Sequence, residues 1–212
     1  MSETGATKDP GCHWDEVYGE RVAHNVSWFQ PEPQISLALI ESLGATVSIP
    51  VVDIGGGASL LVDRLVSRGW RDVTVLDVSD TGLRIARDRL PSGAPVAWLH
   101  QDILVWHPAR RYGLWHDRAV FHFLVAAEDR QTYLDLLEEA VEPGGSVILA
   151  TFSLDGPEYC SGLPVARYSA EELTDLLAGH GFEVVETRQE NHFTPAGAVQ
   201  AFVWVAARQV RQ

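Results

Sequence analysis

A glycine-rich turn between two apolar runs is the feature that most constrains what this chain can fold into. The first run leads through an acidic residue into the turn, in the stretch Val51-Val52-Asp53-Ile54-Gly55-Gly56-Gly57. A second apolar run, Val73 to Leu76, ends in Asp77 about 20 residues after the last glycine. An apolar strand, a glycine turn, a helical pattern and a second strand that ends in an acid are typical of a nucleotide-cofactor site. The turn therefore indicates a cofactor class before anything indicates a substrate.

Composition and charge narrow the class of protein. The 212 residues are 46% hydrophobic, which is enough for one sizeable core. No apolar stretch approaches the about 20 residues that a membrane span needs, and Met1 to Gly11 lack the apolar segment of a secretory signal. We therefore expect a cytoplasmic protein without a membrane partner. A net charge of −13 leaves few cations for a phosphate backbone, so no nucleic-acid partner is expected.

The cysteines and histidines suggest neither a disulfide nor a metal site. Cys12 and Cys160 are expected to be free thiols, because a cytosolic compartment keeps thiols reduced. No cluster of Cys and His has the spacing of metal ligands, so we predict no metal.

Two parts of the chain differ in pattern. Residues 1–33 are expected to hold a tail over Met1 to Gly11, a weak helix from Trp14 to Val22 and an aromatic, proline-bounded loop from Asn25 to Pro33. Residues 34–212 are expected to form the main domain.

Within the main domain, strand-like and helical patterns alternate, which predicts an α/β fold with a mostly parallel sheet covered by helices on both faces. Helices are expected at 34–43, 59–68, 81–90, 130–141 and 169–178, the last one opened by a capping box of Ser169 and Glu172. Strands are expected at 50–54, 72–77, 96–99, 114–117, 146–152, 182–188 and 199–207, with an irregular loop at 154–165.

The chemistry of the turn favours one cofactor. A phosphate-binding Walker loop needs a lysine that is missing here, and the dinucleotide pattern would need a glycine where Leu60 stands. The Asp53 carboxylate would repel a diphosphate but suits a cofactor with an amino group and a sulfonium. Charge therefore favours S-adenosylmethionine over a dinucleotide.

Over residues 34–207 the chain resembles the class I S-adenosylmethionine-dependent methyltransferases. The resemblance is carried in order by VVDIGGGAS, VTVLDVS, HQDIL, LWHDRAVFHF and EPGGSVILATF, and by the closing pair of strands. It implies a Rossmann-like three-layer sandwich with a mostly parallel seven-stranded sheet and an antiparallel last strand. It also implies S-adenosylmethionine as cofactor and S-adenosylhomocysteine as product.

The residues that we expect to contact this cofactor come from the strand ends and the aromatic loop. By the resemblance, Asp77 binds both ribose hydroxyls, Asp102 lies near the exocyclic amine, and the backbone near Asp117 touches the cofactor. Asp77 could instead only open a helix, and Asp102 could only cap a short helical turn. The expected set is Trp28, Asp53, Gly55, Gly57, Asp77, Val78, Asp102, Ile103 and Asp117.

Two residues at and just after the fourth strand are candidates for catalysis. His122 is placed where the fourth-strand motif leads to the substrate, and a histidine can accept a proton near neutral pH. It could equally pack beneath the pocket. Asp117 is the second candidate, and could instead form a structural pair with Arg118, while His116 is expected outside the site.

Substrate contacts are expected from the two most variable parts of the chain. Aromatic residues of the N-terminal segment could close over the sulfonium and exclude water, or could be core contacts of a helix. The long loop at 155–168 adds three polar candidates. The expected substrate-side set is Trp14, Tyr18, Phe29, His122, Cys160, Arg167 and Tyr168.

These patterns leave three functions open. The first is transfer of a methyl group to a small molecule at an oxygen, nitrogen or sulfur that the sequence does not specify. The second is a protein lysine or N-terminal methyltransferase, suggested by the short Trp14-Asp15-x-x-Tyr18 motif. The third is a non-catalytic protein that only binds the cofactor. A monomer or a homodimer is expected.

Overall fold

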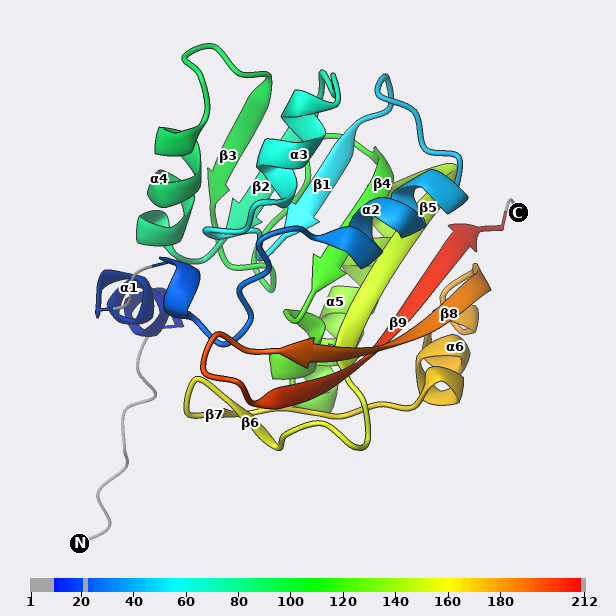
Figure 1. Ribbon diagram of the computed structural model, residues 1–212. Helices are drawn as coiled ribbons and strands as arrows, with labels where there is room; N and C mark the ends of the chain where they lie inside the picture. The colour runs from blue at the N-terminus through cyan, green and yellow to red at the C-terminus, as the bar shows by residue number, and fades with distance from the viewer. Residues whose placement is uncertain (1–9, 21–22, 211–212) are drawn as a thin grey trace, which may run out of the picture.

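The computed structural model describes residues 10–20 and 23–210. Within these residues, a central seven-stranded sheet has helices on both faces (Figure 1). The strands in chain order are β1 (Val51–Ile54), β2 (Val73–Asp77), β3 (Val96–His100), β4 (Tyr112–Arg118), β5 (Val141–Phe152), β8 (Phe182–Phe193) and β9 (Val199–Gln209).

The sheet has the order β3-β2-β1-β4-β5-β9-β8. The first five strands of this order pair in parallel, whereas β9 runs antiparallel to both β5 and β8. This confirms the α/β fold with a mostly parallel sheet and a reversed last strand. Every residue of β1 and β2 is buried, since helices cover both faces of a parallel sheet.

Helices divide between the two faces of the sheet. Those of the described residues are α1 (Pro10–Glu20), α2 (Gln34–Ser42), α3 (Leu61–Ser67), α4 (Asp80–Arg89), α5 (Ala127–Ala140) and α6 (Ala170–Ala178), with single 3₁₀ turns at Ala23–Asn25 and Phe121–Phe123. Apolar side chains of α2, α3 and α4 pack into one buried cluster, and those of α5 and α6 pack into the cluster on the opposite face. This arrangement is the three-layer sandwich that the alternation predicted.

Helix α1 and strand β8 have bounds that differ from the sequence-based expectation. Helix α1 begins at Pro10, so Pro10 and Gly11 are helical rather than part of a tail, and proline suits the first position of a helix. Residues 21 and 22, where this helix was expected to continue, lie outside the described residues, as do residues 1–9. Strand β8 continues to Phe193, beyond the expected end, because it pairs with β9 along its length.

The loop expected at 154–165 is not wholly irregular. It holds a small hairpin of β6 (Tyr159–Cys160) and β7 (Leu163–Pro164). Ser161 and Gly162 form its two-residue turn with φ of 50° and 80°. Positive φ at both central residues is the geometry that a tight hairpin favours. The Ser-Gly pair was therefore a hairpin signal that the sequence analysis passed over.

The carboxyl ends of β1, β2 and β4 meet at one edge of the sheet, and α1 lies beneath that edge (Figure 1). Helix α1 is fixed there by Asp15, whose Oδ1 accepts hydrogen bonds from Ser79 Oγ at 2.6 Å and from the Thr81 backbone N–H at 3.0 Å. In parallel sheets of this kind, ligands bind outside the carboxyl ends of the strands. Among the described helices, none is long and apolar enough to cross a membrane.

Candidate functional site

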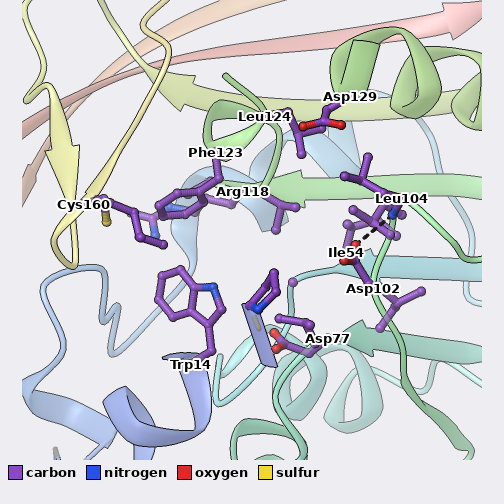
Figure 2. A pocket seen from close by; sticks show the side chains of 18 of the residues that line it. Trp14, Ile54, Asp77, Asp102, Leu104, Arg118, Phe123, Leu124, Asp129 and Cys160 are labelled. Atoms are coloured by element: carbon purple, nitrogen blue, oxygen red, sulfur yellow. Dashed lines mark hydrogen bonds between the residues drawn. The ribbon is translucent and has the colours of Figure 1, made fainter. Parts of the chain in front are cut away.

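A cavity of about 340 Å³ lies at the carboxyl edge of the sheet. Residues at the ends of β1, β2 and β4 or directly after them line it, among them Gly55, Asp77 and Ala119. Trp14 and Tyr18 of α1 and Trp28 of the following loop cover it from the other side. The chain thus brings its glycine turn, the acid after the second strand and its N-terminal aromatic residues to one cavity (Figure 2).

The glycine turn has a backbone that only glycine adopts readily. Gly55 and Gly57 have φ of 65° and 41°. A Cβ atom at Gly55 would collide with the Val120 side chain, and one at Gly57 would collide with the Tyr18 hydroxyl. Gly55 lines the cavity, whereas Gly57 is covered by Tyr18. The two glycines therefore let the turn lie directly against its neighbours.

Asp77 is a buried carboxylate that lines the cavity at the end of β2. Its Oδ1 accepts a hydrogen bond from the Ser79 backbone N–H at 2.7 Å, so it also takes part in the entry to α4. Burial raises the pKa of Asp77 to about 7, and the nearby Asp53 and Asp15 carboxylates add to the effect. A ligand that donates hydrogen bonds here would favour the ionised form.

Asp102 and its neighbours form the far wall of the cavity. Asp102 Oδ1 accepts a hydrogen bond from the Leu104 backbone N–H at 2.9 Å, so the expected alternative of a turn cap is present. Asp102 nonetheless lines the cavity, together with Val78, Ile103 and Leu104. The site there offers a carboxylate beside apolar walls.

Asp53 faces away from this cavity. Its Oδ1 lies 2.7 Å from His116 Nδ1, and His116 Nε2 lies 2.9 Å from Ser36 Oγ on α2. All three residues are buried. Asp53 and His116 line a smaller cavity of about 50 Å³ behind the glycine turn, together with Phe29. The structure thus places the expected cofactor residue Asp53 in a hydrogen-bonded row beneath the turn.

Asp117 holds the chain that follows β4. Its Oδ1 accepts a hydrogen bond from the Val120 backbone N–H at 2.8 Å, and its Oδ2 accepts one from Tyr133 Oη at 2.6 Å and one from the Phe121 backbone N–H at 3.1 Å. Burial raises the pKa of Asp117 to about 6. Its side chain lines neither cavity, so the structure gives it a place in the loop rather than at a substrate.

His122 packs beneath the cavity instead of lining it. Its ring lies 4.5 Å from that of Phe123 and 4.6 Å from that of Phe152, between centroids. Its Nδ1 accepts a hydrogen bond from the Phe152 backbone N–H at 3.3 Å. Burial and the neighbouring Arg118 lower the pKa of His122 to about 3. This environment matches the packing alternative and leaves a neutral imidazole without access to a substrate proton.

Aromatic rings enclose one end of the cavity. Trp14 contacts Phe123 and Trp28 edge to face, with centroids 5.2 and 5.6 Å apart, and Tyr18 contacts Trp28 at 6.1 Å. All four line the larger cavity. Phe29 contributes only to the smaller one. The N-terminal segment therefore brings aromatic faces to the site from more than 20 residues before the glycine turn.

The three substrate-side candidates in the loop after β5 lie in different environments. Cys160 lines the cavity, and burial raises the pKa of its thiol to about 11. Arg167 instead binds the carbonyls of Leu154 and Gly156 and the carboxylate of Glu158 within its own loop. Tyr168 packs on Phe121 with centroids 5.5 Å apart. Only Cys160 reaches the cavity.

Arg118 is the lining residue of greatest chemical interest that the sequence analysis missed. It was interpreted there only as the partner of Asp117, yet it lines both cavities. Its position at the end of β4 matches that of Asp77 at the end of β2, and this was the signal that could have identified it. Other lining residues that the sequence analysis did not single out are Gln101, Leu104, Ala119, Val120, Phe123, Leu124, Asp129, Phe152 and Phe202.

The known proteins that this chain resembles in sequence are named as methyltransferases. Residues 51–145 match the family model of a methyltransferase domain. An uncharacterized methyltransferase of Mycobacterium tuberculosis is 34% identical over 116 residues, which are 54% of this chain and 56% of that protein. A probable thiol methyltransferase of Arabidopsis thaliana is 29% identical over 120 residues, 54% of this chain and 50% of that protein. The chain thus matches about half the length of these relatives.

Solved structures resemble the whole fold. The N-methyltransferase NodS from Bradyrhizobium japonicum, in complex with S-adenosylhomocysteine, has a TM-score of 0.70 at 18% identity and covers 92% of this chain and 97% of its own. A methyltransferase from Anabaena variabilis that depends on S-adenosylmethionine has a TM-score of 0.73 at 15% identity and covers 94% of both chains. At these identities the likeness establishes the fold alone.

Proposed function

We propose that this chain, whose residues 51–145 match the family model of a methyltransferase domain and whose fold resembles that of S-adenosylmethionine-dependent methyltransferases, transfers a methyl group from S-adenosylmethionine to a small molecule. The observation that carries the proposal is the buried Asp77 carboxylate, which lines the cavity at the end of β2 beside the glycine turn.

The residues of the cavity fit the adenosine part of this cofactor. Asp77 has carboxylate oxygens to accept hydrogen bonds from a ribose diol, and a charged acceptor strengthens each bond. Val78, Ile103 and Leu104 offer apolar walls for the adenine ring, and Asp102 offers an acceptor for its amino group. Of these residues, the resemblance had assigned Asp77 to the ribose and Asp102 to the adenine amine, and had placed Val78 and Ile103 in the cofactor set.

The aromatic end of the cavity fits the charged part of the cofactor. The faces of Trp14, Trp28 and Phe123 attract a cation and exclude water from it. When bound, the cofactor supplies an electrophilic methyl group on a sulfonium. The N-terminal segment therefore acts as a lid over the reacting centre in our proposal.

We assign the protein a role in positioning and desolvation rather than a side-chain base. His122 and Asp117 were the candidate bases, but neither lines the cavity and both are engaged in packing or loop contacts. The walls align the acceptor with the cofactor and keep water out. Turnover by this account needs no proton transfer to His122.

A small acceptor fits the cover over the cavity better than a protein does. Helix α1 is fixed across the site through Asp15 and leaves its aromatic side chains facing inward. Among the relatives, one is named a probable thiol methyltransferase and another a ubiquinone biosynthesis O-methyltransferase. The acceptor atom stays open between oxygen, nitrogen and sulfur.

The proposal is tested with methyl-labelled S-adenosylmethionine. The protein is incubated with the labelled cofactor and with cell extract divided into small-molecule and protein fractions, and His122→Asn serves as a matched variant. We expect label in the small-molecule fraction, at similar rates for both proteins. Label only in the protein fraction would favour the protein methyltransferase. Cofactor binding without label in either fraction would favour the non-catalytic alternative.

A further inference from the structure

We propose that Arg118 recognises a carboxylate on the methyl acceptor, so that the substrate of this site is an organic acid. The inference rests on the proposed function, because it concerns the part of the cavity that lies away from the nucleoside residues Asp77 and Asp102. It adds a substrate class and a residue that sets specificity.

Arg118 lies on the acceptor side of the cavity. It appears beside Phe123 and Cys160, whereas Asp77 and Asp102 lie across the cavity (Figure 2). Its neighbours along the sheet come from β5 and β9, which lie beyond β4 on the side away from β2. The ribose and adenine positions follow β2 and β3, so Arg118 stands apart from the nucleoside residues.

The guanidinium is buried, and two of its three nitrogens have no hydrogen-bond partner. Its Nη1 donates to the Trp28 carbonyl oxygen at 3.1 Å. Its Nε and Nη2 are shielded from solvent and have no hydrogen-bond partner. These two nitrogens share one edge of the guanidinium and form the fork that binds a carboxylate through two parallel hydrogen bonds. Buried donors without partners are costly, so a carboxylate is the ligand that this edge lacks.

The carboxylate of Glu190 lies near Arg118 but does not bind its Nε and Nη2 edge. Glu190 Oε2 lies 3.9 Å from Arg118 Nη2, too far for a hydrogen bond. Both carboxylate oxygens of Glu190 are already bound, by Gln30 Nε2 at 2.8 Å and by Trp204 Nε1 at 2.9 Å. Glu190 therefore holds the guanidinium in place electrostatically and leaves the enclosed Nε and Nη2 edge without a hydrogen-bond partner.

Aromatic side chains near Arg118 indicate which kind of group the carboxylate of the acceptor carries. The guanidinium carbon lies 4.5 Å from the centre of the Phe202 ring, and Phe152 and Trp28 line the same part of the cavity. A bound acid draws the fork from the Phe202 ring toward the cavity, and the apolar body of the acid packs between the rings. The chemistry fits an aromatic or aliphatic carboxylic acid.

The test compares benzoate with benzamide, a neutral molecule of nearly the same shape. Calorimetry measures the affinity of each for protein saturated with S-adenosylhomocysteine. We expect benzoate to bind about tenfold or more tightly than benzamide, because only benzoate forms the charged fork. Arg118→Met should abolish this preference and leave the affinity for S-adenosylhomocysteine within about threefold. Arg110→Met, at an exposed arginine that pairs with Asp72, is the control and should keep the preference.

Three results would overturn the inference. The first is equal affinity of the wild type for benzoate and benzamide, which includes no binding of either. The second is a preference for benzoate that survives in Arg118→Met. The third is a tenfold loss of S-adenosylhomocysteine affinity in that variant. The last result would assign Arg118 to the cofactor. If circular dichroism shows Arg118→Met to be unfolded, Arg118→Lys, which keeps the charge without the fork, should lose most of the preference. Failure of the proposed function is distinguishable, since the wild type would then not bind S-adenosylhomocysteine.

Discussion

Four aspartates at or near the ends of the parallel strands have different partners, and these partners separate their roles. Asp77 and Asp102 line the cavity, although each also accepts one backbone hydrogen bond. Asp53 and Asp117 are bound by His116 and by Tyr133, and neither lines the larger cavity. The first pair is available to a ligand, while the second pair shapes the turns that carry the site.

The pKa of Asp77 predicts how cofactor affinity depends on pH. Burial raises this pKa to about 7, so the carboxyl is largely protonated at pH 6 and ionised at pH 8. Ribose hydroxyls bind the ionised form more strongly. We expect the affinity for S-adenosylhomocysteine to fall about tenfold from pH 8 to pH 6, measured by calorimetry. Asp77→Asn should bind weakly with little pH dependence, and an equally steep profile in this variant would refute the assignment.

Asp117 should matter for stability. Asp117→Ala removes the acceptor of two backbone N–H groups and of the Tyr133 hydroxyl, all in a buried setting. We expect the free energy of unfolding to fall by about 2–4 kcal/mol, measured by urea denaturation. Asp135→Ala, at an exposed position of α5, is the control and should change it by less than about 0.5 kcal/mol. Similar losses in both variants would contradict the account of the loop.

Sequence reasoning identified Asp77 and Asp102 because spacing from the glycine turn is a local signal. It could not foresee the partner of Asp53, since His116 lies 63 residues away and meets it only when β1 and β4 pair. Nor could it place Arg118, because an arginine beside an aspartate indicates a local pair as readily as a cavity residue. Contacts between distant strands decide such roles.

At the scale of elements, hydrogen bonds accepted by Asp15 connect α1 to the segment that follows β2. Ser79 caps α4 through its hydroxyl, which accepts from the Gly82 backbone N–H at 3.0 Å and donates to Asp15. Residues 77–82 thus connect the acid at the end of β2, the start of α4 and helix α1, which covers the cavity.

We predict that Asp15→Ala loosens this cover. The variant loses both hydrogen bonds to the start of α4, so the Trp14 and Tyr18 side chains should close the cavity less often. Amide hydrogen exchange in residues 10–20 should speed up, and affinity for S-adenosylhomocysteine should fall by about threefold to tenfold. Asp80→Ala, at an exposed residue in the first turn of α4, is the control. Unchanged exchange and affinity in Asp15→Ala would show that α1 does not act as a lid.

The elements themselves were largely predictable because their signals are periodic or sharply bounded. The buried runs of β1 and β2 and the capping box of α6 were read directly, and the structure confirms them. The extension of β8 and the hairpin of β6 and β7 were not predicted. Pairing partners fix the length of an edge strand, and four of the twelve residues in β8 are polar and exposed, which leaves little apolar pattern to read.

At the scale of the whole molecule, sheet order explains how short motifs far apart in the sequence form one site. Strands β1, β2 and β4 lie side by side in parallel, so the residues after each strand line the same cavity. The reversed β9 pairs with β5 and brings Phe202 to the cavity. In our proposal the fold thus arranges nucleoside, sulfonium and acceptor positions along one edge.

The central claim is that this edge binds S-adenosylmethionine through Asp77. Calorimetric titration of the wild type and of Asp77→Ala with S-adenosylmethionine tests it most directly. The account predicts measurable binding to the wild type that weakens by about tenfold or more in the variant, since a charged acceptor of two hydroxyls is lost. Binding of equal strength to both proteins, or no binding to the wild type, would contradict it.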